Sequence, residues 1–412
     1  MQNITNLLWQ KITDNHQRVE DFFADKFQEN PPLFYNSVDI RHAGFKIAPI
    51  DTNCFPAGFN NLSANSKELA KDVADKFLTK HFPDAKKIII IPEGHTRNLS
   101  YLTNVAYLEE IISSKRDVKV GTMIEGITES TKIDLENGLF ITLHPLKKSD
   151  NTLTTIDGFE ADVAILNNDL TDGIPSLLEN VKTPIIPSQH IGWHNRAKSD
   201  HFDIYNKLAI EISAILDIDP WLISSMHEAC DNIAFKEKKG IDSLAKLVDE
   251  TNEKLTAKYQ EYHINDAPYC YIKADSGTYG IAVWPVSNGT EVLEINKKAR
   301  NKMNMLKGSV QNEQVLVQEG IQTVDKIKNT IAEPMIYMIG GQVVGNLFRT
   351  NEARDEKISL NASGAVFHDL EQLSDDEITL GSTKEKVIIV YSLIARLAAV
   401  AAAIENISNK NN

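Results

Sequence analysis

The chain has 412 residues, of which 42% are hydrophobic and 24% are charged, as in a globular protein of two or three domains. Its formal net charge of −14 argues against a nucleic-acid-binding protein, because no basic domain stands out. The cysteines Cys54, Cys230 and Cys270 form no CxxC pair, which argues against a disulfide framework or a zinc knuckle. The polar N-terminus has no signal-peptide core, so we expect a cytoplasmic protein.

Residues 1–82 are expected to form a helical segment followed by a polar hairpin. Apolar residues at helical spacing predict a helix over residues 1–30, and Pro31-Pro32 ends it. Two strand-like runs and a further helix follow, at residues 35–40, 45–50 and 66–81. A loop rich in Asp, Asn, Pro and Gly separates the second run from this helix.

Residues 83–262 alternate between strands and helices, which is typical of an α/β lobe with a mainly parallel sheet. Helices are expected after the first strand and over residues 205–262. Because ligands meet such sheets at the carboxyl ends of the strands, we expect a substrate lobe here. The predicted strands lie at residues 87–91, 118–123, 139–143, 162–166 and 184–187.

Residues 263–412 begin with YCYIKADSGTYGIAVW at residues 269–284, which predicts two strands joined by a small-residue loop. Backbone N–H groups of such a loop can approach an anion, and Lys273 on the first strand can neutralise phosphate charge. The pattern is not the Walker motif, and a hairpin without a ligand is the alternative.

Later strands are predicted at residues 314–318, 334–339 and 342–349, the last two forming a hairpin around Gly340-Gly341. The apolar stretch at residues 387–404 nears the length of a membrane span. Arg396 near its middle and its high alanine content instead favour a buried helix, because a charge at mid-bilayer is costly.

The order of these features resembles the ATP-grasp ligases: a lysine on a strand, a small-residue loop, a strand ending in Gln-Glu, a hairpin, an arginine strand and an asparagine in a glycine-bearing segment. The stretches APIDTNCFPAGFNNL, YIKADSGTYGIAVW and VVGNLFRTN are similar to the proteobacterial ATP-grasp glutamate–cysteine ligases. The resemblance spans nearly the whole chain. It implies an α/β ATP-grasp fold with a parallel-sheet substrate lobe, and ATP and Mg²⁺ as cofactors.

The resemblance also assigns roles to individual residues. Lys273, Arg349 and Asn361 are the implied catalytic residues, with Lys273 at the α- and β-phosphates and Arg349 at the γ-phosphoryl group. Without this context, a surface salt bridge explains Arg349 equally well. The implied nucleotide-binding residues are Lys273, Ser276, Gly277, Thr278 and Gly280, the adenine hinge Gln318, Glu319, Gly320 and Ile321, and Glu333 at the ribose. Substrate binding is expected of Arg41, Asn351 and Asn361, and a second phosphate lysine of Lys236, Lys239 or Lys246.

The metal ligands that ATP-grasp enzymes carry near the C-terminus have no counterpart there. The first hairpin instead holds Asp39 on one strand and Asp51-x-Asn53 after the next, followed by Pro56 and Gly58. We therefore expect a circularly permuted grasp domain with its metal hairpin at the N-terminus, since domain termini are often close together. Carboxylate and amide oxygens suit Mg²⁺. The alternative is that these side chains only shape a turn.

Two polar loops of the parallel lobe are weaker candidates. Glu93, Arg97 and Asn98 lie where a strand ends and a helix begins, and could hold an amino-acid carboxylate. A capping loop with a surface arginine is the alternative. The loop at residues 189–196 could bind glutamate or cysteine. A zinc site there lacks support, because its histidines have no cysteine or clean helical pair beside them. These histidines are His190, His194 and His201.

The function implied by the resemblance is an ATP-dependent carboxylate–amine ligase. It would form γ-glutamylcysteine from L-glutamate and L-cysteine through a γ-glutamyl phosphate, the first step of glutathione synthesis. Two alternatives stay open: an ATP-grasp ligase for other amino acids, and a catalytically degenerate nucleotide-binding regulator. The expected partners are small-molecule substrates, with no nucleic acid and no membrane, and a homo-oligomer is left open.

Overall fold

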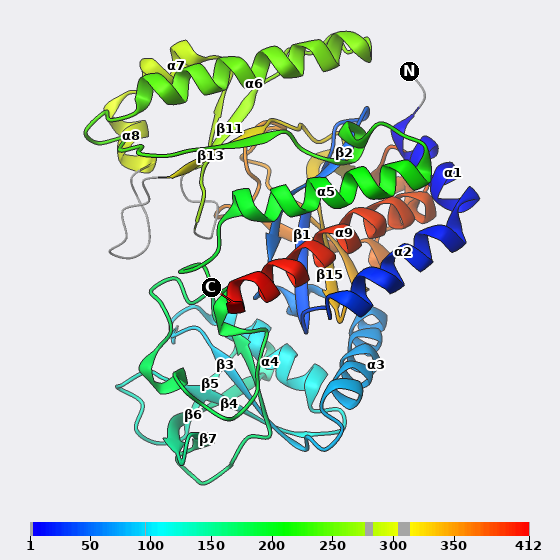
Figure 1. Cartoon of the computed structure of the whole chain (residues 1–412). Coiled ribbons are helices and arrows are strands. Elements are labelled where there is room, and N and C mark those ends of the chain that lie inside the picture. The colour runs from blue at the N-terminus through cyan, green and yellow to red at the C-terminus, as the bar shows by residue number, and fades with distance from the viewer. Residues whose placement is uncertain (1–2, 95, 277–282, 304–313, 412) are drawn as a thin grey trace.

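The computed structural model describes residues 3–94, 96–276, 283–303 and 314–411. These residues form three sheets, one above another in Figure 1, with helices packed against them. The expected α/β class is confirmed. Short 3₁₀ turns lie at η1 (Phe59–Asn61), η2 (Glu136–Gly138), η3 (Ser176–Leu178), η4 (Gln189–Ile191), η5 (Pro220–Ile223), η6 (Leu370–Gln372) and η7 (Asp375–Glu377).

A mainly parallel sheet forms the lower lobe in Figure 1, in the strand order β5-β6-β4-β3-β8-β9. Only β5 and β7 run antiparallel, both to β6. Apolar runs such as IIII in β3 suit a central strand buried on both faces. The elements are α3 (Ala64–His81), β3 (Lys87–Pro92), α4 (Leu99–Ile112), β4 (Asp117–Thr122), β5 (Thr131–Asp134), β6 (Phe140–Ser149), β7 (Thr152–Thr155), β8 (Val163–Asn167) and β9 (Ile185–Ile186).

The upper sheet is antiparallel, in the order β10-β13-β11-β12, and helix α6 packs on it. The two strands expected over residues 269–284 are confirmed, because β11 pairs with β12, whereas residues 277–282 of the loop lie outside the described residues. Strand β10 reads HEAC, without apolar alternation, so the pattern predicted only helices over residues 205–262. The elements are β10 (His227–Cys230), α6 (Ile241–Glu261), β11 (Cys270–Ala274), β12 (Val283–Val286), α7 (Gly289–Leu293), α8 (Lys297–Met303) and β13 (Val315–Glu319).

The central sheet joins the two ends of the chain. Its order is β17-β16-β15-β1-β2, so the N-terminal hairpin lies beside the C-terminal one, with Tyr35 opposite Ile339. This juxtaposition is the one that a circular permutation predicts. The elements are β1 (Tyr35–His42), β2 (Ile47–Asn53), β15 (Thr330–Ile339), β16 (Gln342–Thr350) and β17 (Val366–Asp369), with β14 (Lys326–Ile327) and β18 (Ile378–Thr379) at one end.

Among the described residues, four helices cover one face of this sheet, and α3 packs on the other. The four are α1 (Ile4–Asp14), α2 (His16–Glu29), α5 (Lys198–Leu216) and α9 (Lys384–Asn411). The single helix expected over residues 1–30 is instead two, separated at Asn15, whose side chain donates to the carbonyl of Lys11. Helix α9 is long and apolar enough to span a membrane by composition, but 72% of its apolar window is buried inside the protein. The prediction of a buried alanine-rich helix is thereby confirmed.

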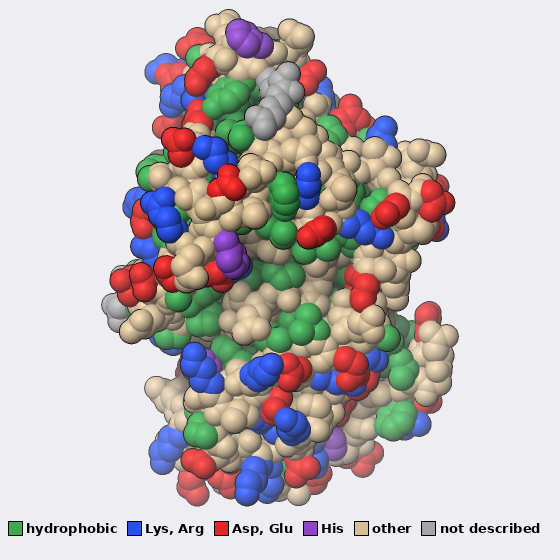
Figure 2. Space-filling model, turned by 90° about the vertical axis from the view of Figure 1, so that its right-hand side faces the viewer, with side chains coloured by type: hydrophobic (Ala, Val, Ile, Leu, Met, Phe, Trp, Pro, Cys, Tyr) green, Lys and Arg blue, Asp and Glu red, His purple; other side chains and the backbone are tan. Residues whose placement is uncertain are grey.

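The charge within α9 has a local partner. Arg396 donates to Glu20 of α2 at 2.6 and 3.0 Å, and its guanidinium lies 3.9 Å from the centroid of the Phe23 ring. The helix therefore keeps its one central charge at the edge of the helical layer. On the face drawn in Figure 2, acidic and basic side chains are interspersed.

Candidate active site

The lysine expected at the phosphates lies against the N-terminal hairpin. Lys273 on β11 donates to the carbonyl of Ile50 on β2 (3.0 Å) and to Oε1 of Gln318 on β13 (2.7 Å). The β1–β2 register shifts between Asp39 and Ile40, which leaves Ile50 as the extra residue of a bulge. Lys273 uses the carbonyl of this bulge and so joins the upper sheet to the hairpin.

The two carboxylates expected to bind metal face each other. Asp39 lies opposite Asp51 in the β1–β2 ladder, a position in which side chains stand close together. Each carboxylate has its own cation. Nη2 of Arg349 lies 3.2 Å from Oδ2 of Asp39, and Nζ of Lys198 lies 2.7 Å from Oδ1 of Asp51. The β1–β2 hairpin therefore brings two carboxylates together, and β16 and α5 each supply a cation to them.

The two carboxylates titrate differently because their surroundings differ. Burial, helped by neighbouring carboxylates, outweighs the Arg349 guanidinium and raises the pKa of Asp39 to about 6. Burial also disfavours the charged form of Asp51, but Lys198 and Lys273 outweigh it and lower the pKa of Asp51 to about 2. Burial in turn lowers the pKa of Lys273 to about 8, against the pull of Asp51.

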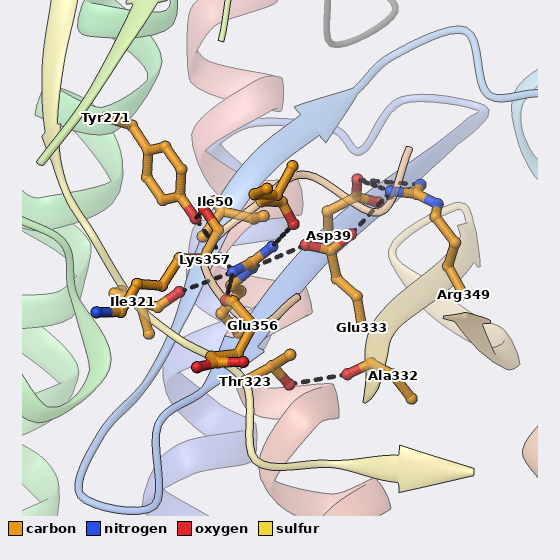
Figure 3. Close-up of polar contacts among 12 residues, drawn as sticks. Asp39, Ile50, Tyr271, Ile321, Thr323, Ala332, Glu333, Arg349, Glu356 and Lys357 are labelled. Carbon is orange, nitrogen blue, oxygen red and sulfur yellow. Dashed lines mark hydrogen bonds and ion pairs between the residues drawn. The ribbon is translucent and has the colours of Figure 1, made fainter. Parts of the chain in front are cut away.

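Glu333 on β15 lies between two arginines, and Figure 3 shows its contact with Arg349. Its Oε1 accepts from Nε of Arg41 and its Oε2 from Nη1 of Arg349, each at 2.9 Å. All three side chains are at most 4% exposed. The charges thus alternate from Arg41 through Glu333 and Arg349 to Asp39. Because both oxygens of Glu333 already face arginines, its contact with a ribose stays a prediction.

The remaining residues expected to bind substrate or ribose fall in different surroundings. Arg41 is buried and donates to the backbone carbonyls of Ile321, Glu356 and Ile358. Asn351 is buried and its amide donates within its own loop, whereas Asn361 is exposed. Arg41 and Asn351 therefore have protein partners here. Their contacts with substrate, like that of Asn361, stay predictions.

The side chain of Glu319 in the expected adenine hinge is paired with a buried cation that sequence reasoning missed. The carboxylate of Glu319 accepts from Nζ of Lys46 (2.8 Å) and from Nε1 of Trp221 (3.2 Å). Lys46 and Glu319 are at most 1% exposed, and Nζ of Lys46 lies 4.2 Å from the centroid of the Trp221 ring. Ile321, two residues further along, is 1% exposed. The end of β13 is therefore held rigidly.

Lys198 is the main functional candidate that sequence reasoning missed. It is the first residue of α5, and its backbone N–H donates to the carbonyl of Asp275 (2.8 Å). The Asp275 carboxylate accepts from the backbone N–H and the hydroxyl of Ser199. The loop after β11 is thus tied to the start of α5. The signal was the basic RAKSD motif at the end of the polar loop, residues 196–200.

The upstream lysines expected as candidates for the second phosphate contact lie on the surface. Lys236 and Lys239 are exposed, and Lys246 is 78% exposed in an ion pair with Glu250 on the same helix. Lys198 is 9% exposed beside Asp51. Lys198 is therefore the better second lysine.

The polar loop before α5 holds β2 from its other side. Arg196 donates to the carbonyl of Thr52 and to Oε1 of Glu405 (2.7 Å), and Nδ1 of His201 lies 3.0 Å from Oε2 of Glu405. Glu405 comes from the last turns of α9. His201 is therefore engaged by a carboxylate. Among the described residues, no three His, Cys, Asp or Glu side chains converge as a metal centre.

The donor groups of the β1–β2 hairpin suit Mg²⁺, which does not need a complete set of protein ligands. Mg²⁺ takes one or two carboxylates from the protein and further oxygens from phosphate and water. Asp39 and Asp51 offer that number. Oδ1 of Asn53 accepts from the N–H of Phe55 (2.9 Å), so this side chain shapes the turn, as the alternative held. A role for Asn53 as a ligand stays a prediction.

The loop of Glu93, Arg97 and Asn98, expected to hold an amino-acid carboxylate, lies at the carboxyl ends of β3 and β8. Asn98 caps α4, accepting from the N–H of Tyr101, and Arg97 is exposed. Oε1 of Glu93 accepts from the N–H of Asp169 (2.7 Å). Of the phosphate loop, Ser276 is described, whereas Gly277, Thr278 and Gly280 lie outside the described residues.

The loop that follows the metal hairpin is bonded to the same end of the parallel sheet. Oδ1 of Asn104 on α4 accepts from the N–H groups of Gly58 and Phe59. Asn167 at the end of β8 donates to the carbonyl of Pro56. The hairpin and the substrate lobe are thereby fixed relative to each other.

The comparisons with known proteins identify the family of this chain. The family model described as glutamate–cysteine ligase matches residues 9–406. A solved structure from Methylobacillus flagellatus KT, named as a gamma-glutamylcysteine synthetase, is 35% identical with a TM-score of 0.90. The match covers 100% of this chain and 97% of the chain in that structure. A D-alanyl-alanine synthetase from Vibrio cholerae is 14% identical, with a TM-score of 0.34 and coverage of 75% and 80%. No curated protein matches. The chain is an ATP-dependent ligase, and it belongs to the glutamate–cysteine ligase family.

Proposed function

We propose that this enzyme joins the γ-carboxylate of L-glutamate to the amine of L-cysteine, with conversion of ATP to ADP and phosphate. The observation that carries the proposal is the convergence of Lys273, Lys198 and Arg349 on the facing carboxylates Asp39 and Asp51. The family match over residues 9–406 supports the choice of substrates.

In the first step, an oxygen of the γ-carboxylate attacks the γ-phosphorus of ATP, and the bond to the bridging β,γ-oxygen breaks. ADP leaves and γ-glutamyl phosphate remains. Lys273 and Lys198 stabilise charge on the phosphates, and Arg349 stabilises the transferred group. Asp39 and Asp51, with Asn53, would hold Mg²⁺, which supplies charge neutralisation at the phosphates. Lys198 and Arg349, which pair with these carboxylates, would then be available to the phosphates.

In the second step, the neutral amine of cysteine attacks the acyl carbon, and the bond from that carbon to the phosphate oxygen breaks. The amine loses its proton and phosphate leaves. The acyl phosphate must be kept from water during this step. We assign that role to the loop that contains Ser276, Gly277, Thr278 and Gly280. We assign the contacts with adenine to Gln318, Glu319 and Ile321. Glu93, Arg97 and Asn98 are our candidates for the glutamate carboxylate.

A trapping experiment tests this function. Phosphate release should require ATP, Mg²⁺, glutamate and cysteine together. When hydroxylamine replaces cysteine, it should attack the same acyl carbon and yield γ-glutamyl hydroxamate. Turnover with a different amino-acid pair would show another ligase, and ATP binding without turnover on any pair would show a regulator. Asp134→Asn, at an exposed carboxylate far along β5, is a control that should keep full activity.

A further inference from the structure

A short segment after β16 is bound through its backbone carbonyls, and Nζ of Lys357 also lies 5.4 Å from the centroid of the Tyr269 ring. Arg41 donates to the carbonyls of Glu356 and Ile358, and the hydroxyl of Tyr271 donates to the carbonyl of Lys357 at 2.8 Å. Three successive carbonyls are therefore held by two side chains. These come from β1 and β11, which belong to different sheets. Figure 3 shows the Tyr271 side chain reaching this segment at Lys357.

The segment has its own internal order. The carboxylate of Asp355 accepts from the N–H of Lys357 (2.9 Å), and the carbonyl of Asp355 accepts from the N–H of Ile358 (3.2 Å). At the base of the loop, the amide of Asn351 donates to the carbonyls of Leu360 and Ser363. The loop thus has a defined shape, and its attachment to the rest of the protein depends on few bonds.

The attachment lies beside the adenine hinge. Nη1 of Arg41 contacts both the carbonyl of Ile321, at 3.2 Å, and the carbonyl of Glu356, at 2.5 Å. Because the two oxygens share one nitrogen, they lie less than about 6 Å apart. The hydroxyl of Tyr271 also accepts from this nitrogen, at 3.2 Å. A ligand seated on the hinge would therefore meet the segment at its edge.

We propose that residues 355–358 form a clasp that closes the base end of the nucleotide site, with Arg41 and Tyr271 as its positioning residues. This inference rests on the proposed function, which places the purine of ATP at the hinge. The clasp acts on binding of the base. The phosphate groups lie toward Arg349, at the far end of the charge series that begins at Arg41. Loss of the clasp should therefore weaken binding of a nucleotide without weakening binding of a triphosphate that has no base.

The neighbouring tyrosines of β11 provide a matched pair of variants. Tyr271→Phe removes the donor to Lys357 and the acceptor for Arg41. Tyr269→Phe makes the same chemical change. In the described part of the chain, however, that hydroxyl contacts only the hydroxyl of Tyr271, at 3.4 Å. Arg41→Lys is a second, stronger variant that keeps the charge facing Glu333 but loses the forked contacts.

The measurement is equilibrium binding of a non-hydrolysable ATP analogue and of inorganic tripolyphosphate, together with hydrogen exchange of residues 352–360. In Tyr271→Phe we expect the dissociation constant of the analogue to rise about 3- to 10-fold, because the hydroxyl that bonds Lys357 and Arg41 is lost. Tripolyphosphate binding should be unchanged, and the loop amides should exchange faster. In Tyr269→Phe all three readouts should stay within about 2-fold of the wild type.

Equal analogue binding by the wild type and Tyr271→Phe would overturn the clasp, as would an equal loss of analogue and tripolyphosphate binding. Failure of the wild type to bind the analogue at all would instead overturn the proposed function. Arg41→Lys should exceed Tyr271→Phe in its loss of analogue affinity. A smaller loss than in Tyr271→Phe would also count against the clasp.

Discussion

Asp39 and Asp51 occupy directly opposed positions on β1 and β2, and each is paired with a cation from a different part of the chain. Arg349 reaches Asp39 from β16, and Lys198 reaches Asp51 from the start of α5. Two like charges side by side are unfavourable unless cations or metal compensate them. The ion pairs therefore keep the hairpin ready for ligand, with phosphate-binding groups already at the site.

Asp51→Asn should abolish most activity while leaving the fold intact, because the amide keeps the shape of the side chain but loses its charge. We expect kcat to fall by about 100-fold or more and the Mg²⁺ concentration for half-maximal activity to rise. A Mg²⁺ titration at saturating ATP measures both. Asp134→Asn serves as the control, since its carboxylate is 82% exposed. An unchanged Mg²⁺ dependence in Asp51→Asn would remove the metal assignment.

The pH dependence of kcat/KM for ATP should be bell-shaped. Asp39, with its pKa raised to about 6, is protonated and unable to hold a metal below that pH, so activity rises as pH increases through about 6. Lys273, with its pKa lowered to about 8, loses its charge above that pH, so activity falls. In Lys273→Arg the alkaline limb should move to higher pH, because a guanidinium stays charged. A limb that stays at about 8 in this variant would exclude Lys273 as its source.

Much of the site could be predicted from the sequence because it depends on local patterns. The strands around Lys273, Gln318 and Arg349 have clear apolar runs, and the hairpin that carries Asp39 and Asp51 was predicted from its two strand-like runs. Local polar residues also predicted the turn at Asn53 as an alternative to a metal ligand. Short-range chemistry decided these features.

The parts that could not be predicted depend on which distant segments meet. Lys198 and Lys46 have no motif of their own, and they become significant only because α5 and the β1–β2 turn fold against Asp51 and Glu319. Arg41 is similar: its position on β1 suggested a substrate contact, but the fold surrounds it with backbone carbonyls. Tertiary contacts of this kind leave no periodic signal in one sequence.

Glu333→Gln should destabilise the protein strongly, because it leaves two buried arginines without their shared carboxylate. We expect the free energy of unfolding to fall by about 3 kcal/mol, measured as a lower urea midpoint. Glu20→Gln is the matched control, since the Glu20–Arg396 pair is partly exposed and should contribute less than about 1 kcal/mol. Equal losses in the two variants would show that burial of the Glu333 pairs does not set their cost.

Lys198→Met should identify the second phosphate lysine. Removing a charge-assisted bond to phosphate should lower kcat/KM for ATP by about 10- to 100-fold. Lys246→Met is the comparison, because Lys246 is 78% exposed on α6. Within the described residues it pairs only with Glu250. Steady-state kinetics with ATP varied at saturating glutamate and cysteine gives the measurement.

Lys198→Arg should distinguish loss of the Lys198 charge from a simple packing defect. The acid limb belongs to Asp39, whereas Lys198 lowers the pKa of Asp51, so this limb should stay near pH 6 in Lys198→Met. Lys198→Arg should restore most of the lost kcat/KM, since a guanidinium carries the same charge. If Lys246→Met lost as much activity as Lys198→Met, or if Lys198→Arg restored none of it, the assignment of Lys198 to the phosphates would be wrong.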